Sequence, residues 1–122
     1  MNKITVAFDV DGTLIKNGAP TEWDMKPNFR IVRLLEALAS FKNVKIVVWS
    51  GGGKDWADSA VKMLGIDRYV GATYDKNLVS CDAAGCKGCT NYHFNPDIVP
   101  DIAIDDIQAC NLGVINLICK EK

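Results

Sequence analysis

Hydrophobic and polar positions divide the chain into blocks that predict buried strands and amphipathic helices. Short runs rich in Val, Ile and Phe, each bounded by polar residues or glycine, are typical of strands buried on both faces of a parallel sheet. Runs of this kind occupy residues 3–8, 44–49, 69–74, 101–104 and 114–118. We therefore expect a sheet of about five strands.

Two helices are predicted between the first three runs. Residues 27–41 begin with Pro27, which suits the first turn of a helix, and they carry a broad apolar stripe opposite charged residues. The stripe consists of Phe29, Ile31, Val32, Leu34, Leu35, Leu38 and Phe41. Residues 54–64 form a second predicted helix that ends at Gly65, a natural left-handed cap. Its inward positions are Trp56, Ala60, Met63 and Leu64.

The alternation of strand and helix predicts an α/β fold, a three-layer Rossmann-like parallel sheet with helices on both faces. Two segments interrupt this alternation. Asn17-Gly18 favours a tight turn between residues 13–16 and 19–23, so we expect a small β-hairpin flap over residues 13–26. Residues 77–100 have little periodicity and form a predicted irregular, Cys-rich insert. We expect residues 1–122 to be a single domain.

Composition narrows the class of protein. The 122 residues are 48% hydrophobic, and 14 Lys and Arg against 15 Asp and Glu give a net charge of -1. A nearly neutral field disfavours non-specific binding to nucleic acid. No apolar run approaches the ~20 residues of a membrane span, so we expect no membrane partner and a cytoplasmic protein. Five Cys, an odd number, favour reduced thiols or a metal site over disulfides.

Acidic residues follow two of the predicted strands. Asp9 and Asp11 come after the first strand, and Asp105 and Asp106 come after the fourth. The carboxyl ends of strands in an open parallel sheet line the ligand crevice. Four carboxylates that meet there need a proton or a hard cation, and Mg²⁺ suits oxygen ligands best. The alternative is that each pair caps a helix or stabilises a turn.

Three segments resemble signatures of the haloacid dehalogenase (HAD) superfamily of phosphotransferases. Residues 8–14, Phe-Asp-Val-Asp-Gly-Thr-Leu, resemble its first signature closely. Residues 47–52 are similar to the second, a strand that ends in Ser or Thr, and residues 102–106 resemble the fourth. The resemblance implies a small HAD member without a cap domain. It also implies a Mg²⁺-dependent phosphomonoester hydrolase that forms an aspartyl-phosphate.

The resemblance gives each matched aspartate a role. Asp9 would be the nucleophile that attacks phosphorus. Asp11 would protonate the leaving oxygen and later activate water, and its backbone carbonyl would help to hold the metal. Asp105, with Asp106 as partner or substitute, would complete the magnesium site.

Phosphate binding is predicted around the second signature. Ser50 would hydrogen-bond the transferring phosphoryl group with the amides of Gly51 and Gly52, although Ser50 would also suit a simple helix cap. The family's third signature is a Lys or Arg. Lys76 follows the third predicted strand and is our choice, Lys87 is the competitor, and Lys76 would otherwise be merely solvated.

The insert contains a possible zinc site. The pattern C-x4-C-x2-C-x3-H, made by Cys81, Cys86, Cys89 and His93, supplies three thiolates and an imidazole for a structural Zn²⁺. Free thiols, a different ligand such as Asp82, and an isolated surface His93 are the alternatives. Cys110 and Cys119 lie in apolar sequence and suit the core.

Several points about substrate stay open at this stage. Only residues 15–26 have the position and length to cover the site, so a substrate's phosphate would enter an open crevice or one closed by another subunit. Besides the hydrolase, we consider a catalytically silent, zinc-containing binding module and a phosphatase for polynucleotide ends. The latter needs Arg30, Arg33 and the insert on one basic face. Trp23 is expected to pack on the sheet edge rather than stack on substrate, and Trp49 and Trp56 are expected in the core without chemistry.

Overall fold

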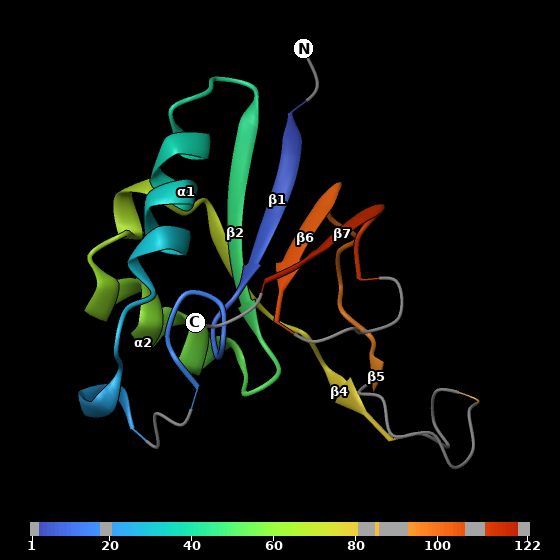
Figure 1. The fold of residues 1–122 in the computed structure, drawn as a ribbon. Helices are drawn as coiled ribbons and strands as arrows, with labels where there is room; N and C mark the ends of the chain where they lie inside the picture. The colour runs from blue at the N-terminus through green and yellow to red at the C-terminus, as the bar shows by residue number, and fades with distance from the viewer. Residues whose placement is uncertain (1–2, 18–20, 81–84, 86–92, 107–111, 120–122) are drawn as a thin grey trace.

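The computed structural model describes residues 3–17, 21–80, 85, 93–106 and 112–119 of the chain. Five strands form one sheet in which each neighbouring pair runs parallel (Figure 1). Side by side, they are β3 (Ala72–Asp75), β2 (Val44–Ser50), β1 (Ile4–Asp9), β6 (Ile102–Asp105) and β7 (Ile115–Ile118). The predicted parallel sheet of five strands is therefore confirmed.

The strand order reverses beside β1. The chain builds β1, β2 and β3 outward in one direction, then returns to add β6 on the other side of β1. Ligands of open parallel sheets bind outside the carboxyl ends of the strands at such a reversal. Both β1 and β6 end there in an aspartate, Asp9 and Asp105.

Both helices cover one face of the sheet. Helix α1 (Phe29–Ala39) and helix α2 (Lys54–Leu64) pack on the side chains of β1 and β2 that include Phe8 and Val48, and Figure 1 shows both helices on the same side. Helix α2 ends at Gly65 with a φ of 67°, the left-handed cap expected from the sequence. Helix α1 starts later than predicted, because Pro27 pairs with Ile15 instead of joining the first turn.

The apolar stripes are narrower than the sequence suggests. Phe29, Leu34 and Phe41 are exposed, as is Met63 of α2, while Val32 and Leu35 carry the contact of α1 with the core. The predicted apolar stripe was therefore too wide. A single sheet face covers only the centre of such a stripe, so the residues at its two sides stay exposed.

The prediction of helices on both faces is not borne out in the described part of the chain. The opposite face buries Ala7, Val47, Trp49 and Ala103, and the described residues that cover it are Phe94, Ile98 and Leu112. Right-handed crossovers place α1 and α2 together, because β1, β2 and β3 follow one another in the same direction. The return from β3 to β6 would place a helix on the other face, but its described residues, 76–80, 85 and 93–101, are irregular or in short strands.

The flap differs from a hairpin. Residues 22 and 23, expected in its second strand, belong to a 3₁₀ turn (Glu22–Asp24), and the chain returns beside Ile15 and Lys16 only at Lys26 and Pro27. Trp23 is 82% exposed, so its predicted packing on the sheet edge was wrong. The remaining turn residues, 18–20, lie outside the described part.

The third strand is shorter than predicted. Residues 67–69 form a second 3₁₀ turn (Asp67–Tyr69), and β3 begins only at Ala72. After β3 the insert starts with β4 (Leu78–Val79), which pairs antiparallel with β5 (His93–Phe94). This two-stranded ribbon lies beyond the carboxyl ends of the main strands in Figure 1.

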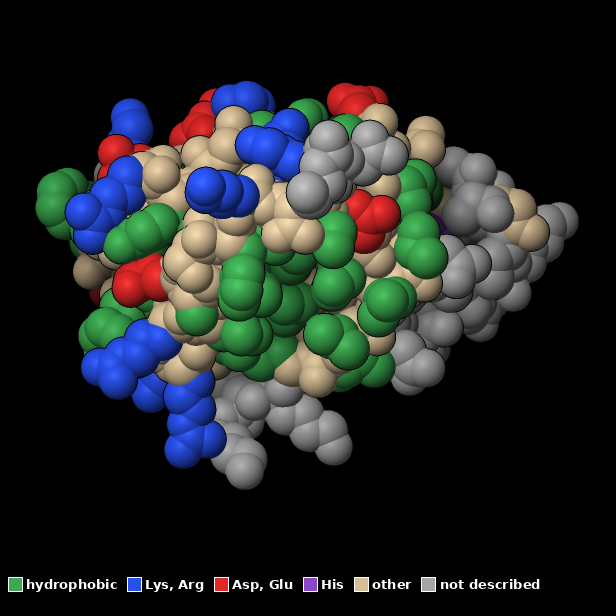
Figure 2. All heavy atoms as spheres, turned by 90° about the horizontal axis from the view of Figure 1, so that it is seen from above, with side chains coloured by type: hydrophobic (Ala, Val, Ile, Leu, Met, Phe, Trp, Pro, Cys, Tyr) green, Lys and Arg blue, Asp and Glu red, His purple; other side chains and the backbone are tan. Residues whose placement is uncertain are grey.

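The edge strand β7 is uncovered. All four of its residues are exposed, and three of them, Ile115, Leu117 and Ile118, are aliphatic. Hydrophobic side chains also gather on the face of the molecule that Figure 2 shows. Cys119, just after β7, is half-buried against the core as expected, and Cys110 lies outside the described residues. Among the described residues there is no helix with the length and apolar character to cross a membrane.

Candidate active site

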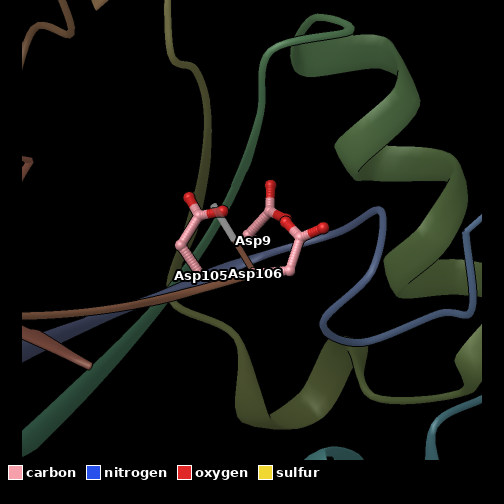
Figure 3. Close-up of side chains that lie close together, drawn as sticks. All are labelled: Asp9, Asp105 and Asp106. Atoms are coloured by element: carbon pink, nitrogen blue, oxygen red, sulfur yellow. The ribbon is translucent and has the colours of Figure 1, made fainter. Parts of the chain in front are cut away.

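Three carboxylates meet at the carboxyl ends of the central strands. Asp9 ends β1, Asp105 ends the neighbouring β6, and Asp106 follows directly. One oxygen from each lies within 4.8 Å of the others. Figure 3 shows the three side chains close together. Parallel pairing of β1 with β6 brings these ends together. The cluster offers three carboxylate oxygens, the kind of donor that hard divalent cations take.

A buried lysine bridges two of these carboxylates. Lys76 follows β3 and is 2% exposed. Its Nζ donates hydrogen bonds to Asp9 Oδ1 at 2.6 Å and Asp105 Oδ2 at 2.5 Å. Its backbone N–H donates to the Ser50 carbonyl at 3.0 Å, which fixes the lysine beside the end of β2. Lys76 is therefore not a solvated surface residue. Its competitor, Lys87, lies outside the described residues.

Burial and neighbouring charges shift the pKa values of Asp9 and Lys76. Burial is the largest cause that raises the pKa of Asp9 well above its ordinary value; the charge of Lys76 opposes this shift and that of Asp105 adds to it. Burial acts to lower the pKa of Lys76, but the charges of Asp9 and Asp105 outweigh it and the pKa is raised. Lys76 therefore stays cationic. Its single positive charge lies beside three carboxyl groups, so the cluster would attract a further cation.

Residues just after β1 orient the cluster. Thr13 Oγ1 donates to Asp9 Oδ2 at 3.3 Å, and Asn17 Nδ2 donates to Asp106 Oδ2 at 3.4 Å. Gly12 has a φ of +80°, and a Cβ there would collide with the carboxylate of Asp106. The tight turn thus requires glycine for both its backbone conformation and the close approach of Asp106.

Asp11 has a partner that the sequence did not reveal. The indole Nε1 of Trp56, in the first turns of α2, donates to Asp11 Oδ2 at 3.0 Å. The Asp11 carboxylate is not one of the three clustered groups. Trp56 was expected in the core without chemistry; it does pack against the core, but its N–H is directed at the site. Trp49 is fully buried, as expected.

The turn after β2 presents the backbone of two glycines. Ser50 is buried at the end of β2, and its Oγ accepts a hydrogen bond from the Gly52 N–H at 2.9 Å. Gly51 and Gly52 line the cavity, and α2 begins at Lys54. A helix start preceded by glycines offers N–H groups and a favourable dipole to an anion.

These residues surround one open cavity of about 410 Å³. Its described lining consists of Asp9, Asp11, Asn17, Gly51, Gly52, Lys76, Leu78, Phe94 and Asp106. Leu78 and Phe94 were not predicted as site residues. Only the pairing of β4 with β5 brings them together, and two residues per strand leave no recognisable sequence pattern.

The predicted zinc ligands fall mostly outside the described residues, which include His93 but not Cys81, Cys86 or Cys89. His93 pairs with Val79 in the ribbon. The zinc site therefore stays a prediction.

No family model, curated protein or solved structure matches this chain.

Proposed function

We propose that this chain is a Mg²⁺-dependent phosphomonoester hydrolase that works through an aspartyl-phosphate, as its resemblance to the HAD superfamily implies. The observation that carries the proposal is the buried Lys76, bonded to Asp9 and Asp105 within a cluster of three carboxylates. A buried ion group of this kind is costly for a fold whose only need is stability, so it favours a functional site.

The metal would be held by Asp9, Asp105 and Asp106, and by the backbone carbonyl of Asp11 as the resemblance implies. When bound, Mg²⁺ neutralises carboxylate charge and polarises the phosphoryl oxygens. Lys76 adds a fixed positive charge beside Asp9 and holds that carboxylate in one orientation. Thr13 supports the same orientation, because its hydroxyl donates a hydrogen bond to the other oxygen of Asp9, Oδ2.

The reaction would use Asp9 and Asp11 in turn. An oxygen of Asp9 attacks phosphorus, the P–O bond to the alcohol breaks, and Asp11 gives its proton to the departing oxygen. Water then attacks the phosphorus of the Asp9 acyl phosphate while Asp11 takes a proton from that water. Inorganic phosphate leaves, and Asp9 is again a carboxylate and Asp11 protonated.

Two further groups would position the reacting atoms. The Trp56 N–H holds the Asp11 side chain toward the cavity wall, which limits the rotamers available to the acid. Ser50 Oγ is held by the Gly52 N–H, so Gly52 positions the serine hydroxyl, and the Gly51 N–H would donate to a phosphoryl oxygen.

Turnover of p-nitrophenyl phosphate with and without Mg²⁺ tests this proposal. We expect hydrolysis that stops in EDTA and returns with Mg²⁺, and a loss of at least about a thousandfold in Asp9→Asn. Asp67→Asn is the matched control, because Asp67 is an exposed aspartate in a turn away from the cavity. Full activity of Asp9→Asn would contradict the mechanism. Mg²⁺ binding without turnover of any phosphoester would instead favour the silent binding module.

A further inference from the structure

The insert supplies an apolar wall to the catalytic cavity. Leu78 on β4 and Phe94 on β5 are directly paired across the ribbon, so their side chains share one of its faces. Both line the cavity that contains Asp9 and Lys76. Leu78 is 53% exposed although it is aliphatic and lies beside charged groups. An uncovered aliphatic side chain at the rim of a polar cavity is suited to contact with an apolar ligand group.

The wall is fixed to the site by several contacts. Asn77 takes a left-handed φ of 56°, which turns the chain from β3 into the ribbon. The Asn77 side chain donates to the Asn95 carbonyl at 3.1 Å, and the Asn95 N–H donates to the Asn77 backbone carbonyl at 2.9 Å. Phe94 packs so closely on Gly51 that a Cβ there would lie 3.2 Å from its ring. The ribbon is thus held in place at its base.

Phe94 also contacts the lysine of the carboxylate cluster. The Lys76 Nζ lies 5.0 Å from the centre of the Phe94 ring, within the range of a cation–π interaction. The wall therefore begins directly beside the lysine that is bonded to Asp9 and Asp105.

The charges of the cavity disfavour an alcohol that carries negative charge. Nine described residues line it, of which three are acidic and one, Lys76, is basic and already bonded to two carboxylates. Further phosphates, such as those of a nucleotide or a nucleic-acid strand, would face Asp11 and Asp106 with no second cation among the described lining residues. Among the described lining residues, a sugar would find a single neutral polar side chain, that of Asn17.

We infer that the substrate is the phosphomonoester of an uncharged, largely apolar alcohol whose hydrocarbon part packs against Leu78 and Phe94. This inference rests on the proposed hydrolase function. It places substrate selection in the ribbon of the insert.

The test compares kcat/KM for benzyl phosphate and glycerol 1-phosphate. Both esters release a primary alcohol, so their ratio reports contacts of the leaving group more than its acidity. We expect the native chain to prefer benzyl phosphate by about tenfold or more, the range that partial burial of a phenyl group gives. Leu78→Ser should lower this preference about fivefold, and Leu78→Ala should give an intermediate value.

Leu117→Ser is the matched control, since Leu117 is 51% exposed on β7 and does not line the cavity. It should keep the native ratio. A native ratio near one, an unchanged ratio in Leu78→Ser, or faster hydrolysis of a 3′-phosphorylated oligonucleotide would overturn the inference. Oxygen exchange between inorganic phosphate and ¹⁸O-water, measured with Mg²⁺, requires no alcohol. If ¹⁸O exchange occurs but the kcat/KM ratio of the two esters is near one, only the inference about the alcohol is overturned. If neither exchange nor turnover occurs, the hydrolase function is overturned as well.

Discussion

Replacing Lys76 by Met removes the ammonium that two buried carboxylates share. The Nζ lies 2.6 Å from Asp9 and 2.5 Å from Asp105, and the lysine is 2% exposed, so solvent does little to screen the loss. Removing one partner of a buried ion group costs about 3–5 kcal/mol. An independent bound agrees, since protonating one carboxyl with an ordinary pKa of about 3.9 at pH 7 costs about 4 kcal/mol.

The loss is large enough to measure by thermal unfolding. The unfolding entropy of a 122-residue chain is about 0.26 kcal/mol per kelvin, so Lys76→Met should lower Tm by about 12–19 °C at pH 7 without added metal. Mg²⁺ should restore part of this loss, because a divalent cation replaces the missing positive charge.

The loss should depend on pH with a definite sign. In the variant, unpaired buried carboxyls have raised pKa values, so the folded state binds more protons than the unfolded state. Stability of the variant relative to the native chain therefore falls as pH rises through the pKa of Asp9 in the native chain, which is itself raised by burial, and the two chains differ less below that pKa. Calorimetry between pH 4 and 7 measures this difference.

Lys54→Met is the matched control. Lys54 forms an i,i+4 ion pair with Asp58 at 3.0 Å, but its side chain is 59% exposed. The same substitution there should change stability by less than about 0.5 kcal/mol. A loss below about 1 kcal/mol in Lys76→Met, or a loss that does not change with pH, would refute the buried ion group as a determinant of stability.

Three further predictions address other contacts. Trp56→Phe should lower kcat about tenfold with little change in KM, because the indole N–H no longer fixes Asp11; steady-state kinetics showing only a KM effect would argue against this role. The pKa of Asp58 is lowered, and the hydrogen bond from Thr73 is the largest cause. This carboxylate therefore stabilises the fold above pH ~4, and the stabilisation is lost as pH falls below that value. The native chain should exceed Asp58→Asn by at most about 1 kcal/mol in unfolding free energy at pH 7, with the gap closing near pH 3. Zinc analysis of chelator-washed protein should give about one equivalent, lost in Cys86→Ser, and less than about half an equivalent in the native chain would count against the site.

The sheet and the carboxylate cluster were predictable because they follow from local pattern and one topological rule. Each buried strand is a short β-branched run, and strands in a parallel sheet end at the same edge. Asp9 and Asp105 therefore had to approach each other once β1 and β6 were neighbours. Lys76 was predicted because it directly follows β3, the strand beside β2.

Contacts that depend on side-chain direction or on irregular backbone were not predictable. Trp56 and Asp11 are 45 positions apart, and their hydrogen bond depends on how α2 rotates on the sheet. Leu78 and Phe94 meet only through the register of a two-residue ribbon. The hairpin expected from Asn17-Gly18 is not confirmed, because the described residues after it include a 3₁₀ turn and the segment closes at Pro27.

The ribbon leaves the main sheet after Lys76 and rejoins it past Asn95, and the paired hydrogen bonds of Asn77 and Asn95 keep these two ends adjacent. Residues between them can be exchanged or lengthened while the anchoring points stay fixed, since closing a longer loop adds little entropic cost. A graft in this segment should therefore alter which alcohol is accepted and leave the five strands intact. The catalytic residues at the ends of the sheet strands and the residues that select the alcohol in the ribbon could then evolve separately.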